Sequence, residues 1–548
     1  MANNDSAQLR QAKDDAVEPK TEAQAVPDST STGNTPPLQV PERAPASDEL
    51  MANIAPPIDT GTFLDRSFTF GRNTAWVIVI AIGLIAAVLF RIAQLDAYAL
   101  TQREAAWAYN GFTIYVGKSM TGAPDVPAFS PLFMMLESFA FFLFGVTDAT
   151  ARIMPALFGI GLILLTFALR PFVSRYVLLA WILMIGLSPT LVFASRTVSP
   201  VIEVCFFALL VVVSILRAGI AGSESRMIVW SGLVAFGIAS LIATGVDGVT
   251  ALLSIAVGIG VGSLTEPRDG SPGAVRRGIV AIGSSTTNGL ILAVIILGSL
   301  ILFFTQFFSD INGVDGVITT FSTWGRMMGT QSSFTPTSIF FWSSLLYEFL
   351  AVAFAIVATL VPRRINPDGH STLFPPLLTG WFVTALVLGS LAQGRDPDQA
   401  ALIALPLVLL GGMGLGYALE RVPWTRIFRT QAGLVPLAIA GITIGVISTL
   451  TIIARANDEQ RQNDGFASLL IQVAFIFLLL VAPLVYFISR EFADKARARY
   501  VGWSALIVLA VLLGLFGIRS TSMLAMSRAS DGVELLAPRA PTDGVKAM

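Results

Sequence analysis

The chain has little of the residue types on which most soluble enzyme sites depend. Among its 548 residues there is one cysteine, Cys205, and one histidine, His370. A single cysteine excludes a disulfide within the chain and a cysteine metal cluster. A single histidine excludes a histidine-based triad and a multi-histidine metal site. Any chemistry of this chain therefore uses carboxylates, arginine, lysine, tyrosine and the backbone.

Charge is scarce as well, whereas apolar residues are abundant. Charged residues make up 13% of the chain and hydrophobic residues 54%, and the mean hydropathy is +0.72. A soluble core cannot absorb so much apolar surface. The composition predicts an all-α, polytopic integral membrane protein, located in the cell membrane.

The charged residues divide the chain into three parts. Residues 1–65 contain four basic and eleven acidic side chains, a net charge of −7, and are rich in Ala, Pro, Ser and Thr. This composition predicts a disordered acidic tail. A transmembrane domain is expected over 66–521 and a flexible outer tail over 522–548. Arg66 and Arg72 precede the first apolar run, which favours a cytoplasmic N-terminus.

Apolar runs long enough to cross a bilayer predict about thirteen transmembrane helices and a C-terminus on the outside. The 30-residue run at 279–308 is longer than a bilayer needs, so it is expected to tilt or protrude. The expected spans are 74–90, 153–169, 176–194, 200–216, 228–246, 248–264, 279–308, 338–361, 375–392, 400–419, 431–454, 467–488 and 500–518.

The segment 131–146 decides on which side of the membrane every later loop lies. It has about sixteen residues, is rich in phenylalanine and contains Glu137, as in a helix lying at the membrane interface. If it does not cross, sixteen Arg and Lys residues fall in inner loops and five in short outer loops. The positive-inside rule favours this arrangement. The first outer loop, about 91–152, then contains interfacial helices.

Several blocks of sequence in this order resemble a known class of membrane enzymes. They are FFLFGVTDATARIMPALFG (141–159), SPTLVFASR (188–196), FFSDINGVDG (307–316), SLLYEFLAVAFAI (344–356) and ALPLVLLGGMGLG (404–416). With the long acidic first outer loop, they resemble the GT-C class of membrane glycosyltransferases. The closer likeness is to the flippase-activity-associated proteins of archaeal N-glycosylation type, relatives of the dolichyl-phosphate-mannose protein mannosyltransferases.

The chain departs from this family at several positions. Family members usually carry an Asp-Glu pair followed by a His where this chain has Arg103, Glu104 and Trp107. Their His-Gly-Pro element is Phe-Ser-Pro at 129–131 here, and no Asp follows Arg196. These changes leave the expected fold intact and put the catalytic machinery in question.

The resemblance places Glu104 on the second acid of the family's pair and makes it the first catalytic candidate. A carboxylate there would take the proton of an acceptor hydroxyl or hold a divalent metal ion at the donor phosphate. The alternative is a solvated acid paired with Arg103. Asp96, eight residues upstream, is the second catalytic candidate, with a loop or cap residue as the alternative.

Three arginines are candidates for binding the donor phosphate, because Arg binds phosphate through paired donors. Arg196 and Arg395 lie in outer loops under this topology, and the alternative for each is a surface charge. Arg152 follows Asp148 by four residues, so the alternative there is an ion pair within one helix.

Two acids, Glu203 and Glu348, lie inside apolar spans, where a carboxylate is costly unless it is paired or faces water. Each is a site candidate, with a structural hydrogen bond as the alternative. The outer-loop acids Asp310, Asp315, Asp396 and Asp398 could hold a metal or be solvated turns. The aromatics Trp107, Tyr109, Tyr115 and Trp324 could stack on sugar rings or anchor the chain at the interface.

Together these observations indicate a membrane glycosyltransferase-like protein that transfers a sugar from a polyprenyl-phosphate donor at the outer face. The alternative is a catalytically degenerate relative that binds lipid-linked glycan or helps to translocate it. Expected partners are a polyprenyl-phosphate sugar or lipid-linked glycan, membrane lipids and a protein of a glycan pathway, and no nucleic acid. A transporter is a third possibility, for which Glu203 and Glu348 are the only acids within spans.

Overall fold

A computed structural model describes residues 72–117, 130–266, 273–283, 286–309, 311–328, 337–360, 374–392, 396–421 and 521. All of them belong to the second of two units of the chain, Phe70–Met548. The expected tails 1–65 and 522–548, the last three expected spans and Arg395 lie outside the described residues.

The described residues form helices joined by short turns, and their only β-type pairing is an isolated bridge between Met328 and Ala392. In chain order the helices are α2 (Arg72–Ile92), α3 (Gln102–Tyr115), α4 (Pro131–Phe144), α5 (Asp148–Ala151), α6 (Ile153–Leu165), η2 (Thr166–Phe172), α7 (Arg175–Leu187), α8 (Pro189–Ala194), α9 (Val201–Ala218), α10 (Glu224–Ala243), α11 (Val246–Thr265), α12 (Ala274–Gly283), α13 (Thr286–Phe304), η3 (Ile311–Val314), α14 (Asp315–Met327), α15 (Ile339–Tyr347), α16 (Phe349–Leu360), α17 (Phe374–Leu391), η6 (Pro397–Gln399) and α18 (Ala400–Arg421).

Within the described residues, six helical stretches are long and apolar enough to cross a membrane, or up to eight if each of two bent helix pairs is one span. The six are Asp148–Phe172, Val201–Ala218, Glu224–Ala243, Val246–Thr265, Phe374–Leu391 and Pro397–Glu420. The all-α, polytopic membrane class is thereby confirmed. The count of thirteen spans stays a prediction.

Two expected spans are divided by a sharp bend in the structure. The run 338–361 forms α15 and α16, which meet at a bend of 89°. The residue at the bend is Glu348, whose backbone has left the helical region (φ −107°, ψ 28°). The long run at 279–308 is likewise divided, into the short α12 and the longer α13. Hydropathy alone does not show either break, because both halves of each pair are apolar.

Helix α18 lies at the centre of the packing, against α7, α16 and α17. Its glycines allow this close approach, because a Cβ at Gly411 would lie 2.6 Å from the carbonyl oxygen of Ala351. Trp181 of α7 also donates from Nε1 to the carbonyl oxygen of Leu409, at 2.7 Å. Small residues at the contacts between helices are typical of packing in lipid.

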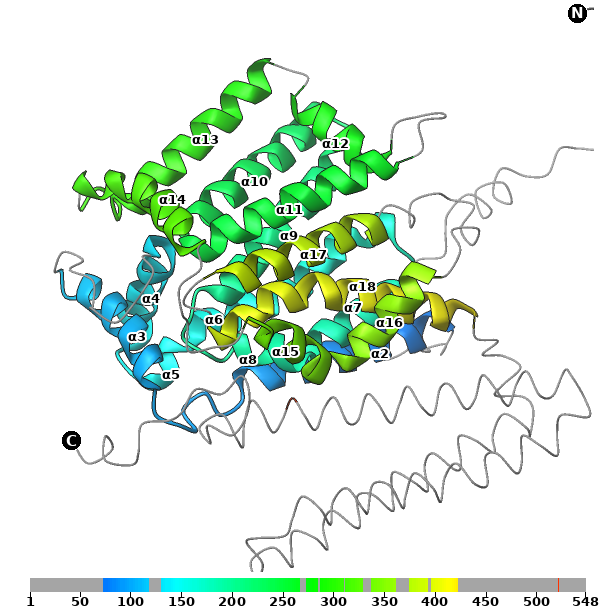
Figure 1. Ribbon diagram of the computed structural model, residues 1–548, viewed down its shortest axis with the longest axis horizontal. Helices are drawn as coiled ribbons and strands as arrows, with labels where there is room; N and C mark the ends of the chain where they lie inside the picture. Colours follow the sequence, from blue (N-terminus) through cyan, green and yellow to red (C-terminus); the bar gives the residue numbers. More distant parts are fainter. Residues whose placement is uncertain are drawn as a thin grey trace, which may run out of the picture. The chain divides into compact units, whose positions relative to one another are not determined.

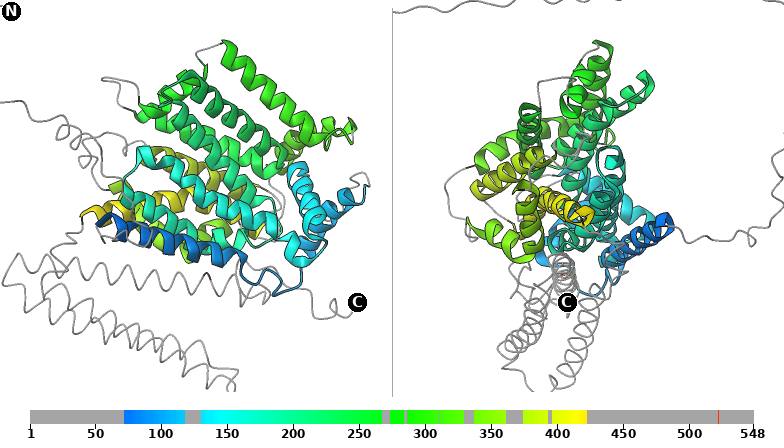
Figure 2. Two further views of the ribbon diagram at one scale, coloured as in Figure 1. Left: turned by 180° about the vertical axis from the view of Figure 1, so that it is seen from behind. Right: turned by 90° about the vertical axis from the view of Figure 1, so that its right-hand side faces the viewer.

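The helices of the expected first outer loop form a separate group at one end of the bundle. Helices α3, α4 and α5 lie there near α14, whereas α12 lies at the opposite end (Figure 1, and from behind in Figure 2). Helix α3 packs on α4, with the rings of Trp107 and Phe133 edge to face at 5.6 Å. At 14 residues α4 is about 21 Å long, less than the hydrocarbon thickness, as expected for an interfacial helix.

Candidate functional site

Glu104 lies in the first turn of α3, and its carboxylate is buried and saturated with hydrogen bonds. Arg152 donates from Nε to Oε1 at 3.2 Å and from Nη2 to Oε2 at 3.1 Å. Thr101 donates to Oε2 from its backbone N–H at 3.0 Å and its hydroxyl at 3.1 Å, which completes a capping box. The backbone N–H of Val198 donates to Oε1 at 3.2 Å. These five bonds occupy both oxygens.

Arg152 uses its remaining donors to hold the loop before α3. Its Nη1 donates to the carbonyl oxygens of Leu95 at 2.8 Å and Tyr98 at 2.9 Å. The ion pair with Glu104 therefore fixes α3, the loop and the start of α6 together. Arg152 was expected to pair with Asp148, four residues earlier. Its ion-pair partner in the structure is Glu104, 48 residues earlier in the chain.

Arg196 caps the C-terminal end of α2. Its Nη1 donates to the carbonyl oxygens of Phe90 at 3.0 Å and Ala93 at 2.6 Å, and its Nη2 to that of Gln94 at 3.0 Å. An arginine on the last carbonyls of a helix satisfies groups that have no partner within the helix. Tyr98 hydrogen-bonds Arg196 as well, and burial raises the pKa of Tyr98 against the opposing charges of Arg196 and Arg152.

The structure thus brings together three predicted site residues, Glu104, Arg152 and Arg196, and engages each with the chain itself. Asp96, the other catalytic candidate, is exposed in the loop after α2. Arg395 lies outside the described residues. Neither a carboxylate with five donors nor a guanidinium holding several carbonyls is free for a substrate in this arrangement.

The two intramembrane acids differ in their surroundings. Glu348, at the bend between α15 and α16, accepts hydrogen bonds from the hydroxyl of Ser188 and, at 3.2 Å, from the N–H of Thr190. It therefore caps the N-terminus of α8, where negative charge is favourable. Glu203, in the first turn of α9, is fully buried, and neither of its oxygens has a hydrogen-bond partner among the described residues.

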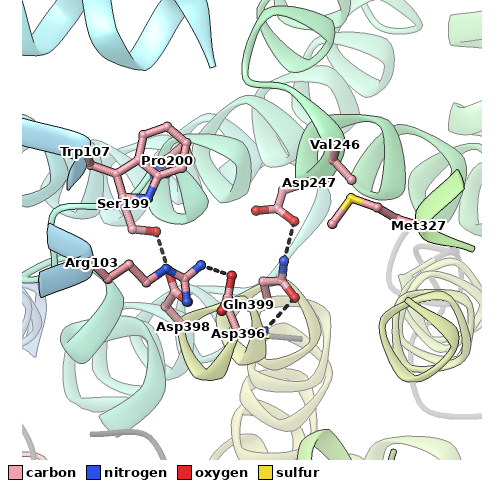
Figure 3. A pocket seen from close by; sticks show the side chains of 10 residues that line it. All are labelled: Arg103, Trp107, Ser199, Pro200, Val246, Asp247, Met327, Asp396, Asp398 and Gln399. Atoms are coloured by element: carbon pink, nitrogen blue, oxygen red, sulfur yellow. Dashed lines mark hydrogen bonds and ion pairs between the residues drawn. The ribbon is translucent and has the colours of Figure 1, made fainter. Parts of the chain in front are cut away.

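A second group of charges lies beside Glu104 and centres on Arg103. The guanidinium of Arg103 forms an ion pair with Asp396, and its Nη1 lies 3.5 Å from Oδ1 of Asp398. Figure 3 shows that these side chains converge on one pocket, together with Asp247 and Gln399. Gln399 donates to Oδ1 of Asp247 at 2.8 Å. Arg103 therefore lies among three carboxylates, Asp247, Asp396 and Asp398.

The pocket forms where four helices begin. Arg103 is in the first turn of α3, Asp247 in that of α11 and Asp398 in η6, which leads into α18. Ser199, just before α9, donates to Oδ2 of Asp398. Helix N-termini carry partial positive charge and stabilise anions, so this meeting point explains why three carboxylates gather there.

The pocket as it stands is small. Its volume is about 20 Å³, which is room for about one water molecule. Trp107 and Met327 form part of its lining. Among the described residues no three His, Cys, Asp or Glu side chains are placed to hold a metal ion together. Arg103 is the cation that accompanies these carboxylates.

Sequence reasoning missed Asp247 and the role of Arg103. Asp247 falls between two expected spans, in TGVDGV, where it reads as a turn residue. Its neighbours in space, Asp398 and Gln399, follow it by about 150 residues. An acid at the start of an apolar helix was the one available signal, and Asp396 and Asp398 were recognised only as outer-loop acids.

No family model matches the chain, and no curated protein matches it. Among solved structures it resembles ArnT from Cupriavidus metallidurans bound to undecaprenyl phosphate, with 16% identity, a TM-score of 0.51 and coverage of 84% of this chain and 79% of that chain. The apo state of the same protein gives 17% identity and a TM-score of 0.52 over the same shares. An oligosaccharyltransferase from Archaeoglobus fulgidus also matches, with 12% identity, a TM-score of 0.49 and coverage of 86% of this chain and 57% of that chain.

The likeness to ArnT shows a common fold. The chain has the all-α, polytopic membrane architecture of the GT-C class, as the sequence blocks implied. At these identities the comparison concerns the fold alone, and the closer likeness to the archaeal flippase-associated proteins stays a prediction.

Proposed function

We propose that the protein binds a polyprenyl-phosphate-linked sugar or glycan at the outer end of its helix bundle and, in the arrangement described, does not transfer the sugar. The observation that carries this proposal is the ion pairing of Arg103 with Asp396 and Asp398. It engages two of the three carboxylates that face the pocket and offsets part of their negative charge. Glu104, the remaining acid of the first outer loop helix α3, is held by Arg152.

The proposed ligand rests on the fold and the membrane setting. The similar ArnT structure contains undecaprenyl phosphate, a polyprenyl phosphate. A lipid-linked donor presents its phosphate at the membrane surface, which is the depth expected for α3 and α4. Arg395 directly precedes Asp396 in the chain, so it is the donor-phosphate candidate that we retain.

A second candidate function is the transfer itself, with Asp247 rather than Glu104 as the general base. Asp247 lines the pocket, is partly exposed, and accepts a bond from Gln399 at Oδ1. A carboxylate so placed could take the proton of an acceptor hydroxyl once the pocket has opened. This alternative requires Arg103 to leave its two aspartates.

The orientation that we propose places α3, α4 and α5 outside, the N-terminus in the cytoplasm and the C-terminus outside. Arginines at the opposite end of the bundle support it, because α9, α10 and α12 carry Arg217, Arg226, Arg276 and Arg277 near that end. Positive residues favour the cytoplasmic side.

Binding is tested on purified protein in detergent by native mass spectrometry with a panel of polyprenyl-phosphate sugars. Wild type is expected to retain at least one sugar donor in preference to the neutral polyprenol. The Arg395→Ala variant is expected to bind that donor about tenfold or more weakly. Arg326→Ala removes an equal charge from the exposed face of α14 and serves as the control. Equal retention of donor and polyprenol by all three proteins would contradict the proposal.

A further inference from the structure

The end of the bundle opposite the outer loop contains a larger pocket. Its volume is about 450 Å³, and it is lined by Arg217, Ser225, Arg226, Val229 and Trp230. It lies where α9 ends and α10 begins. Because α9 has 18 residues, about 27 Å of helix separate this pocket from Ser199 and the Arg103 site. The two pockets are therefore separate sites, one at each end of the bundle.

Arg217 is held in place and retains an unused donor. Its guanidinium lies over the ring of Trp230, 5.4 Å from the centroid, as in a cation–π contact. Its Nε is buried and has no hydrogen-bond partner among the described residues. A buried N–H of this kind is costly unless a ligand or water accepts from it.

Arg226 occupies a position where its positive charge does not stabilise the helix. It lies in the first turn of α10, near the positive end of the helix dipole, which disfavours a cation. Ser223 caps this helix by accepting from the N–H of Arg226 at 3.4 Å, and the exposed Glu224 supplies the acid of the first turn. An anion between Arg226 and Arg217 would relieve the unfavourable charge and engage the N-terminal amides.

The surroundings of the pocket fit a lipid better than a soluble anion. Val229 is 59% exposed and Phe236, seven residues further along α10, is 36% exposed. Residues seven apart lie on the same face of a helix, so an apolar strip leads from the pocket along the span. Trp230 lines the pocket beside Arg217, and tryptophan is the residue type enriched at membrane interfaces.

Helix α12 adds positive charge next to this pocket. It packs against the end of α9, where Gly278 lies close to the carbonyl oxygen of Ile215. Arg277 of α12 also has a buried Nε without a hydrogen-bond partner among the described residues. Glu266 accepts from the N–H groups of Val275 and Arg276 and so caps α12. Basic residues of three helices therefore lie at this end of the bundle.

We propose that the pocket lined by Arg217, Arg226 and Trp230 binds the phosphate headgroup of an anionic membrane lipid in the leaflet opposite the outer loop. Arginine recognises phosphate through paired donors. The stacked Arg217 provides a fixed donor set, Arg226 and Ser225 approach from the start of α10, and an acyl chain follows Val229 and Phe236 along the helix.

The test uses full-length protein in nanodiscs or detergent, with native mass spectrometry of bound phosphatidylglycerol and of phosphatidylcholine with the same acyl chains. Wild type is expected to retain phosphatidylglycerol in preference, and Arg226→Ala to bind it at least tenfold more weakly. Arg226 is exposed, so its removal leaves the packing intact. Arg326→Ala, an exposed arginine of α14, removes the same charge elsewhere and is expected to bind as wild type does.

Two further arms make the outcome decisive. Arg217→Lys keeps the charge but loses Nε and the planar stack, so it is expected to weaken phosphatidylglycerol binding several-fold. Inorganic phosphate at millimolar concentration is expected not to displace the lipid, because it lacks the apolar contact. Equal binding of both lipids, unchanged binding in Arg226→Ala and Arg217→Lys, or full displacement by inorganic phosphate would each overturn the proposal.

Discussion

Arg152 closes on Glu104 through two parallel hydrogen bonds, Nε to Oε1 at 3.2 Å and Nη2 to Oε2 at 3.1 Å, across 48 residues of chain. Both side chains are buried, with exposures of 5% and 6%. The pair connects α3 and the loop before it to the start of α6. Its role in this arrangement is to position the loop.

The first prediction concerns the stability conferred by this pair. Glu104→Ala leaves the guanidinium of Arg152 buried without its carboxylate, and breaking such a pair costs about 3–5 kcal/mol. The expected result is a clear fall in the unfolding temperature of the purified protein, measured by differential scanning fluorimetry. Asp96→Ala, at an exposed acid of the same loop, is the control and is expected to change stability by at most about 0.5 kcal/mol. Equal unfolding temperatures for the two variants would contradict the positioning role.

The second prediction concerns Arg196 and the end of α2. Arg196→Ala removes the donors to the carbonyl oxygens of Phe90, Ala93 and Gln94. We expect faster hydrogen exchange in residues 88–100, because the end of the helix loses its cap. The rest of the bundle should exchange as in wild type. Hydrogen exchange in residues 88–100 that is the same in Arg196→Ala as in wild type would show that the cap is dispensable.

The third prediction concerns the pairing of Arg103 with Asp396. Arg103 is about one-third exposed, so the pair is partly screened, and Arg103→Ala should cost about 1 kcal/mol or less. Removing both partners in Arg103→Ala/Asp396→Asn should cost less than the sum of the single changes, because each single variant leaves an unpaired charge. A double-mutant cycle of unfolding free energies measures this coupling. A coupling of zero would mean that the pair does not form in solution.

The fourth prediction concerns pH and Glu137 in α4. Burial, and to a lesser extent the charge of nearby Glu203, raises the pKa of Glu137 well above its usual range. The folded protein then keeps this proton while the unfolded chain loses it, so stability is highest at low pH and falls as the pH rises above about 4.3. Glu137→Gln should therefore flatten the pH dependence of the unfolding temperature and raise it at neutral pH. A steeper dependence in the variant would contradict this account.

The sequence predicted the helical class and a helix within 131–146, because these depend on composition and local pattern. It did not predict the partner of Glu104, since Arg103 is adjacent in sequence whereas Arg152 approaches through the fold. Nor did it find Asp247, which meets Gln399, 152 residues later in the chain, only in the folded protein. Long-range pairing of charges is a property of tertiary structure, and no local pattern encodes it.

The bend at Glu348 is a second feature that depends on a long-range contact and was not predicted from the sequence. The run 338–361 has the hydropathy of one span, and its acid was a candidate site residue. In the structure the carboxylate of Glu348 caps α8 through Ser188 and Thr190, which lie about 160 residues earlier in the chain. A hydropathy profile shows that an acid lies in an apolar run. It does not show which distant helix terminus donates hydrogen bonds to that acid.

The most direct test of the proposed function is the release of free polyprenyl phosphate from a polyprenyl-phosphate sugar by purified protein in liposomes. The donor is the one found to bind best, and wild type is compared with Asp247→Asn. We expect binding without release in both proteins, because Arg103 is paired with Asp396 and Asp398 and Arg152 holds Glu104. Release by wild type that is lost in Asp247→Asn would contradict this account and identify a transferase with Asp247 as its base.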